Sequence, residues 1–138
     1  MKRAGFTMIE LIFVIVILGI LSAVALPKFI GVSEQAKAGK CKAFVGTMNR
    51  TVLPGIWAGA IADEATDDNI SDYFTEGNLT AQMSDYPTTD CNASAADVEG
   101  LLQDGTTRTI TFGDTSYSIE RNVSASTSES PILVWKKN

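Results

Sequence analysis

The chain has 138 residues, which is enough for one small folded domain and an appendage but not for two separate cores. It contains no histidine, so histidine-based catalytic triads and zinc sites are excluded. The formal net charge is −5, and the acidic residues concentrate beyond residue 62, which argues against general binding to nucleic-acid backbones because phosphate contacts need clustered Lys or Arg.

The amino-terminal stretch predicts a transmembrane helix. Residues 6–26 are almost wholly apolar, and a helix of that length reaches ~30 Å, the thickness of the hydrocarbon layer. Lys2 and Arg3 precede it, so the positive-inside rule keeps the amino end in the cytoplasm and sends the remainder outward. A conventional signal peptide, cleaved after the small-residue run at 23–25, is the competing interpretation.

The same stretch carries a recognisable signal. Residues 2–5 read Lys-Arg-Ala-Gly and residues 6–11 read Phe-Thr-Met-Ile-Glu-Leu. This resembles the amino-terminal signal of type IV prepilins and of type II secretion pseudopilins, and the resemblance extends to about residue 31. Gly19 and Pro27 lie within it and, with Glu10, are the expected assembly residues. It implies that a prepilin peptidase cuts between Gly5 and Phe6 on the cytoplasmic face and that Phe6 is then N-methylated.

The resemblance also implies an organisation and a location. Residues 1–5 are the leader peptide, residues 6–26 the transmembrane and assembly helix, and residues 27–138 an extracytoplasmic pilin-like domain. The implied partners are other copies of the chain in a helical filament, the prepilin peptidase, an inner-membrane assembly platform and, before assembly, membrane lipid. The subunit would span the inner membrane once and then join a periplasmic or cell-surface filament.

A carboxylate inside the apolar stretch argues against a disposable signal peptide. An acidic residue costs about 2.5 to 3.5 kcal/mol at the bilayer centre, so Glu10 has no use in a segment whose only task is to be hydrophobic. We expect Glu10 to pair with the amine that cleavage creates on Phe6, either of its own chain or of a neighbouring subunit. Between subunits, such a pair would fix the register of apolar helices. Simple extension of Glu10 to the membrane interface is the alternative.

Residues 27–53 predict an amphipathic continuation of this helix. Apolar residues recur at intervals of three or four: Cys41, Val45, Met48, Val52 and Ile56. Pro27 is expected to bend or loosen the helix without ending it, whereas Pro54 and Gly55 break the pattern and residues 55–61 offer a further turn or two of helix. The basic residues of this neck are expected to pair with acidic domains of neighbouring subunits; they are Lys28, Lys37, Lys40 and Lys42.

Residues 54–107 are polar and turn-rich, so we expect a variable loop region with short helices near 71–74 and across 95–103. The acids between residues 63 and 72 raise a calcium hypothesis, but the EF-hand spacing is missing. We expect a solvated acidic loop there, with no metal and no cofactor.

Residues 108–138 predict an antiparallel sheet. Apolar and polar residues alternate on both sides of Gly113-Asp114, which indicates a hairpin with a type II′ turn, and residues 131–135 offer a third strand. The expected fold class is α+β and pilin-like: a long amino-terminal helix, transmembrane in its first half and amphipathic in its second, packed on a small carboxy-terminal sheet. Ile110, Phe112 and Ile119 would face the helix stripe.

Two features remain open at this level. Cys41 and Cys91 fit no metal-binding spacing, so they are either one disulfide or two free thiols, and export of the domain favours the disulfide. Five Asn-x-Ser/Thr triplets are expected to be coincidences of a polar composition; they begin at Asn49, Asn69, Asn78, Asn92 and Asn122.

The chain shows no enzymatic signature, because no nucleophile lies beside a recognisable base and no glycine-rich phosphate loop follows a strand. The predicted function is that of a structural subunit of a type IV pilus-like filament, used for adhesion, motility or DNA uptake. The alternatives are a pseudopilin of a type II secretion system and a monomeric membrane-anchored binding domain.

Overall fold

The computed structural model describes residues 5–138, apart from the side chains of Leu26, Pro27 and Ile30. The chain forms two compact units, Met1–Glu34 and Gln35–Asn138. The predicted leader residues Lys2, Arg3 and Ala4 lie outside the described residues. The division after Glu34 lies beyond the expected end of the membrane segment at residue 26, and that membrane boundary stays a prediction.

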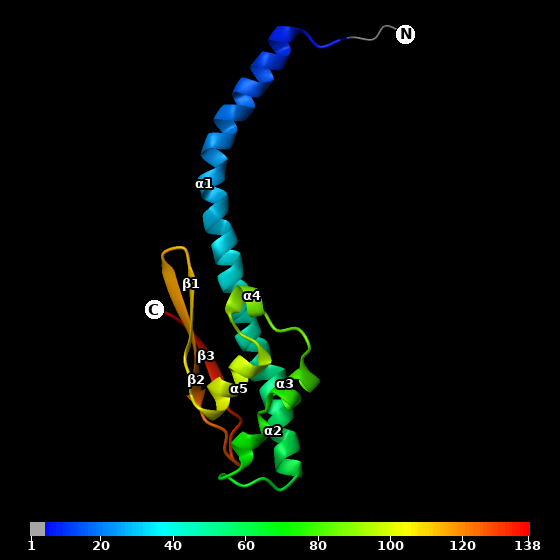
Figure 1. Ribbon diagram of the computed structural model, residues 1–138, viewed down its shortest axis with the longest axis vertical. Coiled ribbons are helices and arrows are strands. Elements are labelled where there is room, and N and C mark those ends of the chain that lie inside the picture. Colours follow the sequence, from blue (N-terminus) through cyan, green and yellow to red (C-terminus); the bar gives the residue numbers. More distant parts are fainter. Residues whose placement is uncertain (1–4) are drawn as a thin grey trace. The chain divides into compact units, whose positions relative to one another are not determined.

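Helix α1, Met8–Thr47, is continuous over 40 residues (Figure 1). Pro27 lies inside it, in keeping with the expectation that this proline does not end the helix. Up to Ala25 the helix is apolar on all sides and exposed, whereas between Cys41 and Thr47 one face is buried in the second unit. The change in burial follows the change from a uniformly apolar to an amphipathic sequence.

The predicted break at Pro54 is wrong, because the helical path continues past it, whereas the further helical turns expected at residues 55–61 are present. A π-helical turn, η1 at Met48–Val52, joins α1 to α2 at Leu53–Ala62, and the amide of Leu53 donates to the carbonyl of Met48, five residues back. Pro54 lies in the first turn of α2, where its missing amide hydrogen is least costly. The wider π turn thus accommodates a proline within a long helical path.

The region predicted as a variable loop, residues 54–107, is mostly helical. After α2 it contains η2, Ile70–Tyr73, then α3, Glu76–Gln82, then α4, Thr88–Cys91, and α5, Ala95–Gln103. The last of these matches the predicted span, and η2 lies where the other short helix was expected. Thr75 caps α3 by accepting from the amide of Asn78, and Ser94 forms a capping box with Asp97 at the start of α5.

The sheet confirms the predicted hairpin and third strand. Its strands are antiparallel and lie in the order β1, Arg108–Phe112, β2, Thr115–Val123, and β3, Ile132–Lys137. Phe112 pairs with Thr115 across the turn. Gly113 has a φ of +56°, whereas Asp114 is not among the described residues with positive φ, which identifies the expected type II′ turn.

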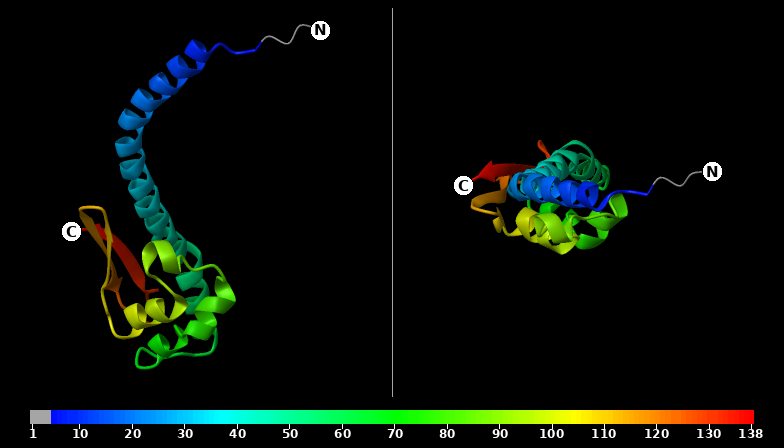
Figure 2. Two further views of the ribbon diagram at one scale, coloured as in Figure 1. Left: turned by 45° about the horizontal axis from the view of Figure 1, so that its top comes forward. Right: turned by 90° about the horizontal axis from the view of Figure 1, so that it is seen from above.

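One face of the sheet joins the helices in a shared core. Ile110 and Ile119 are buried in the same cluster as Val45 and Met48, as the sequence predicted, whereas Phe112 is only partly buried at its margin. Leu133 of β3, which was not predicted to face the helix, is buried in the same cluster. In Figures 1 and 2 the strands form one side of the second unit, and α2, α3 and α5 gather beside them.

Asn49, on η1, fastens the third strand to the helix. Its Nδ2 donates to the carbonyl of Leu133 at 2.7 Å, and its Oδ1 accepts from the amide of Leu133 at 2.9 Å. A single side-chain amide therefore supplies Leu133 with the donor and the acceptor that a neighbouring strand would provide.

Candidate assembly segment

The first unit presents an apolar surface that no described residue covers. Residues Met8–Ala25 form a helical stretch with a mean hydropathy of 2.8 and none of its length buried. Phe13 is 65% exposed and Leu18 is 55% exposed. By length and composition this helix can cross a membrane. Water is a poor solvent for such a surface.

The predicted processing residues lie just before the helix. Gly5, Phe6 and Thr7 are exposed and precede the first helical residue, Met8. The bond between Gly5 and Phe6 therefore belongs to non-helical chain, the conformation in which a backbone is open to a protease. That it is the bond cut stays a prediction.

Thr7 and Glu10 form a capping box, a feature that was not predicted from the sequence. The Thr7 hydroxyl accepts from the amide of Glu10 at 3.3 Å, and the Glu10 Oε2 accepts from the amide and the hydroxyl of Thr7, both at 3.4 Å. The amide of Leu11 donates to the carbonyl of Thr7, which closes the first helical turn. The signal was available, since Thr-x-x-Glu before an apolar run is typical of a helix start.

The capping box shows how Glu10 is held within one chain. Its hydrogen-bond partners are neutral, and no ion pair involves Glu10 among residues 5–138. Neutral hydrogen-bond partners at 3.4 Å offset only part of the free energy of hydration that a carboxylate loses when it leaves water. Its geometry leaves it able to accept a cationic partner from outside the chain.

The other two predicted assembly residues have no distinguishing contact. A Cβ atom placed on Gly19 would meet nothing within 4 Å, so the described part of the chain gives no steric reason for a glycine there. Pro27 lies within α1, and its side chain is outside the described part. The structure thus brings Glu10 together with Thr7 but assigns no local role to Gly19 or Pro27.

The basic neck is only partly free for contacts with neighbours. Lys40 Nζ lies 2.8 Å from Asp90 Oδ2, so this lysine pairs within its own chain. The hydrogen bond and charge of Asp90 raise the pKa of Lys40, and the hydrogen bond from Lys40 lowers the pKa of Asp90. Since the Lys40 side chain is 68% exposed, water screens the pair and its contribution to stability is small. Lys37 and Lys42 remain exposed and better suited to contacts between subunits.

Cys41 and Cys91 are joined by a disulfide, with Cα atoms 5.4 Å apart. Cys41 lies on α1 and Cys91 ends α4, and neither is exposed to solvent. The bond lies next in sequence to the Lys40–Asp90 pair on both elements. The two links together hold the short helix α4 on α1, although α4 has too few residues to be stable alone.

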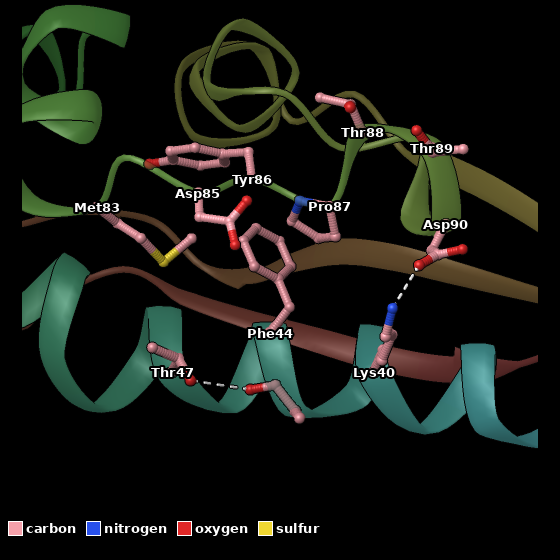
Figure 3. Close-up of a pocket in the computed structure, with 11 residues that line it drawn as sticks. Lys40, Phe44, Thr47, Met83, Asp85, Tyr86, Pro87, Thr88, Thr89 and Asp90 are labelled. Atoms are coloured by element: carbon pink, nitrogen blue, oxygen red, sulfur yellow. Dashed lines mark hydrogen bonds and ion pairs between the residues drawn. The ribbon is translucent and has the colours of Figure 1, made fainter.

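A groove of about 540 Å³ opens beside these links, between α1 and the segment that leads to α4 (Figure 3). Phe44 points from the helix towards Tyr86, and the two rings pack edge to face with their centroids 5.9 Å apart. Among the described residues, no group of three or more Cys, Asp or Glu side chains is placed to hold a metal ion. The groove offers a mixed surface and no arrangement suited to covalent chemistry.

Comparisons with known proteins agree with this picture. Residues 1–26 match the family model of the prokaryotic N-terminal methylation motif. The chain is 33% identical over 112 residues to the type IV narrow pilus major component PilA5 of Thermus thermophilus, an alignment that covers 80% of this chain and 96% of that protein. No solved structure is significantly similar to the chain.

Proposed function

The chain belongs to the type IV pilin family, and from this premise we propose that it is processed by a prepilin peptidase and polymerises through its amino-terminal helix into a pilus-like filament. In this proposal the peptidase cuts between Gly5 and Phe6, and Phe6 becomes N-methylated. The protein is a pilin-like structural subunit, and we expect no enzymatic activity.

The observation that carries this proposal is the uncovered apolar helix with one carboxylate near its start. Covering a Leu, Ile, Val or Phe side chain contributes about 1.5 to 3 kcal/mol, so the helix strongly favours any apolar environment. In the unassembled subunit, a lipid bilayer provides it. In a filament, the helices of other copies replace the lipid.

Glu10 supports assembly in preference to simple anchoring. Cleavage before Phe6 creates a cationic amine four positions upstream of Glu10. Because the carboxylate has only neutral partners among residues 5–138, an amine from a neighbouring subunit would compensate its charge more fully. Such a pair would set the axial position of one smooth apolar helix against the next.

The proposed assembly pathway of the subunit has two stages. It first spans the inner membrane with its amino end in the cytoplasm, where the peptidase acts. An inner-membrane assembly platform then transfers it into the filament outside that membrane. The relative from Thermus thermophilus is named as the major component of a narrow pilus, and the filament role of this chain is carried over from that similarity.

Mass spectrometry of the subunit purified from its own cells tests the processing step. An amino end at methylated Phe6 is expected. An intact Met1 would indicate an unprocessed membrane anchor, and a chain starting at Leu26 would indicate a conventional signal peptide. Either of these results would overturn the proposal.

Two substitutions of Glu10 separate its charge from its capping role. Glu10→Gln keeps a side chain that completes the capping box but removes the charge, whereas Glu10→Ala removes both. We expect both variants to insert into the membrane and to yield few filaments by electron microscopy. Normal filaments from Glu10→Gln would show that capping, and not charge pairing, is what assembly requires.

A further inference from the structure

The asparagines of this chain follow a pattern that composition does not explain. Five of them begin an Asn-x-Ser/Thr triplet, and the remaining one, Asn138, ends the chain. Serine and threonine together account for 25 of the 138 residues, so chance would place about one of the five asparagines in such a triplet. The expectation that these triplets are coincidences therefore needs revision. This triplet is the acceptor for asparagine-linked glycans.

A second feature divides the five triplets. Four have an acidic residue two positions before the asparagine, and the exception is Asn49, which has Thr47 there. With 16 acidic residues in 138, chance would place an acid at this position in only about one triplet in nine. The acid and asparagine pairs are Asp67 and Asn69, Glu76 and Asn78, Asp90 and Asn92, and Glu120 and Asn122.

The structure divides the same triplets in the same way. The four asparagines with an upstream acid are exposed, whereas Asn49 is half-buried. Both polar atoms of the Asn49 amide bond to Leu133, so a sugar on its nitrogen would separate β3 from η1. A glycan is bulky and hydrated and must project from the surface. The four exposed positions satisfy this requirement.

Local geometry ranks the four positions. Asn92 follows α4 with a φ of +44°, and Asn122 lies where the pairing of β2 with β3 shifts register. Within residues 5–138, neither side-chain amide is hydrogen-bonded. At Asn69 the Oδ1 accepts from Thr66 and the Nδ2 is left unbonded. Asn78 differs, because its Nδ2 donates to the carbonyl of Tyr73 and must first release it.

We propose that Asn69, Asn78, Asn92 and Asn122 are N-glycosylation sites and that Asn49 is not. This rests on the proposed function, since it requires export of the second unit to the outer side of the membrane. The asparagine Nδ2 would attack the anomeric carbon of a sugar carried on a polyisoprenyl diphosphate. The new C–N bond replaces the C–O bond to the diphosphate, which leaves with the electron pair, and the amide nitrogen loses one proton.

The upstream acid has a chemical rationale in this scheme. A carboxylate at a fixed distance before the acceptor gives a transferase a charged group to read, and an arginine of that enzyme would bind it by charge-assisted hydrogen bonds. Requiring both the acid and the hydroxyl residue is more selective than requiring the hydroxyl alone. The four sites would then be chosen by sequence, and the fold would tolerate each product.

Intact-mass measurement and peptide mapping of the subunit from its own cells test the proposal. Glycans on any subset of the four asparagines, with Asn49 unmodified, are expected. An unmodified subunit, or a glycan on Asn49, would overturn it. The amino-terminal peptide of the same sample reports on Phe6 independently, so failure of the glycan proposal is distinguishable from failure of the processing proposal.

Variants around Asn122 sharpen the test. Asn122→Gln and Ser124→Ala should each remove one glycan mass, whereas Ser124→Thr should keep it because threonine completes the triplet. Glu120→Gln should reduce occupancy at Asn122 alone, and Glu129→Gln serves as the matched control with no expected change. Equal occupancy in Ser124→Ala and the natural chain would contradict an asparagine-linked glycan at this position.

Discussion

Two regions of this subunit are built from the same apolar side chains and use them in opposite ways. In the stretch Met8–Ala25 these side chains are exposed, and Phe13 is 65% exposed. In the second unit they are enclosed, and Phe74 is not exposed at all. The stability of the second unit therefore depends on contacts within the chain, whereas the apolar helix depends on what surrounds the chain.

The largest expected effect contrasts two phenylalanines. Phe74→Ala should lower the free energy of unfolding of the second unit by about 3 to 5 kcal/mol, because it leaves a cavity in a closed core. Phe13→Ala should leave that value unchanged. Chemical denaturation of the full chain in detergent, followed by tryptophan fluorescence, measures this, since Trp57 and Trp135 both lie in the second unit. Equal effects of the two substitutions would contradict the conclusion that only the second unit is stabilised by contacts within the chain.

Loss of the disulfide should have the next largest effect. Cys41 and Cys91 are separated by 50 residues, and a cross-link across such a loop stabilises by about 4 kcal/mol through the entropy of the unfolded chain. The double variant Cys41→Ala and Cys91→Ala should show this loss by the same fluorescence assay. The natural chain with reductant is the control. If reductant destabilises the double variant as well, the effect does not come from this bond.

Asn49→Ala should destabilise the second unit by about 2 to 3 kcal/mol. It leaves the amide and the carbonyl of Leu133 without their partner in a half-buried place, and an unsatisfied buried group costs about 1 to 3 kcal/mol. Thr51→Ala, at an exposed position on the same π turn, is the control. Hydrogen exchange at Leu133 should rise in Asn49→Ala, and unchanged protection there would refute the role of Asn49.

The smallest expected effect concerns pH. Burial alone would raise the pKa of Asp97, but hydrogen bonds from Ser94 and the charge of Arg108 outweigh it and lower this pKa. A carboxyl group whose pKa is lower in the folded chain stabilises the fold at neutral pH, and this contribution is lost as the pH falls below about 4. Asp97→Asn should therefore flatten the acid side of the stability profile. If unfolding free energy falls as steeply with decreasing pH in Asp97→Asn as in the natural chain, Asp97 does not make this contribution.

The sequence predicted those elements whose signals are local. The hairpin at Gly113 and the helix at 95–103 each combine a periodic apolar pattern with a turn or cap residue, and both are present. Helices α3 and α4 were missed because each buries a single residue, Leu79 and Cys91 respectively. One buried residue gives no period to detect.

Other features depend on partners distant in the sequence. Lys40 was expected to bind a neighbouring subunit, and its partner, Asp90, lies 50 residues away in its own chain. Pro54 was interpreted as a break before a further helical segment at 55–61, because the π turn that makes the path continuous has no sequence signature. In the assembly segment, Glu10 was identified from the energetic cost of a carboxylate in an apolar environment. Its local partner, Thr7, was missed, although the Thr-x-x-Glu capping motif predicts this contact.

The bond between Asn49 and Leu133 has a consequence for a protein that would exist as many crowded copies. A strand at the margin of a sheet invites the equivalent strand of another molecule to add to it, which leads to unregulated aggregation. At Leu133 the side chain of Asn49 already occupies both groups that an incoming strand would need. The third strand is thus closed to sheet growth at that point, and copies can pack closely without merging their sheets there.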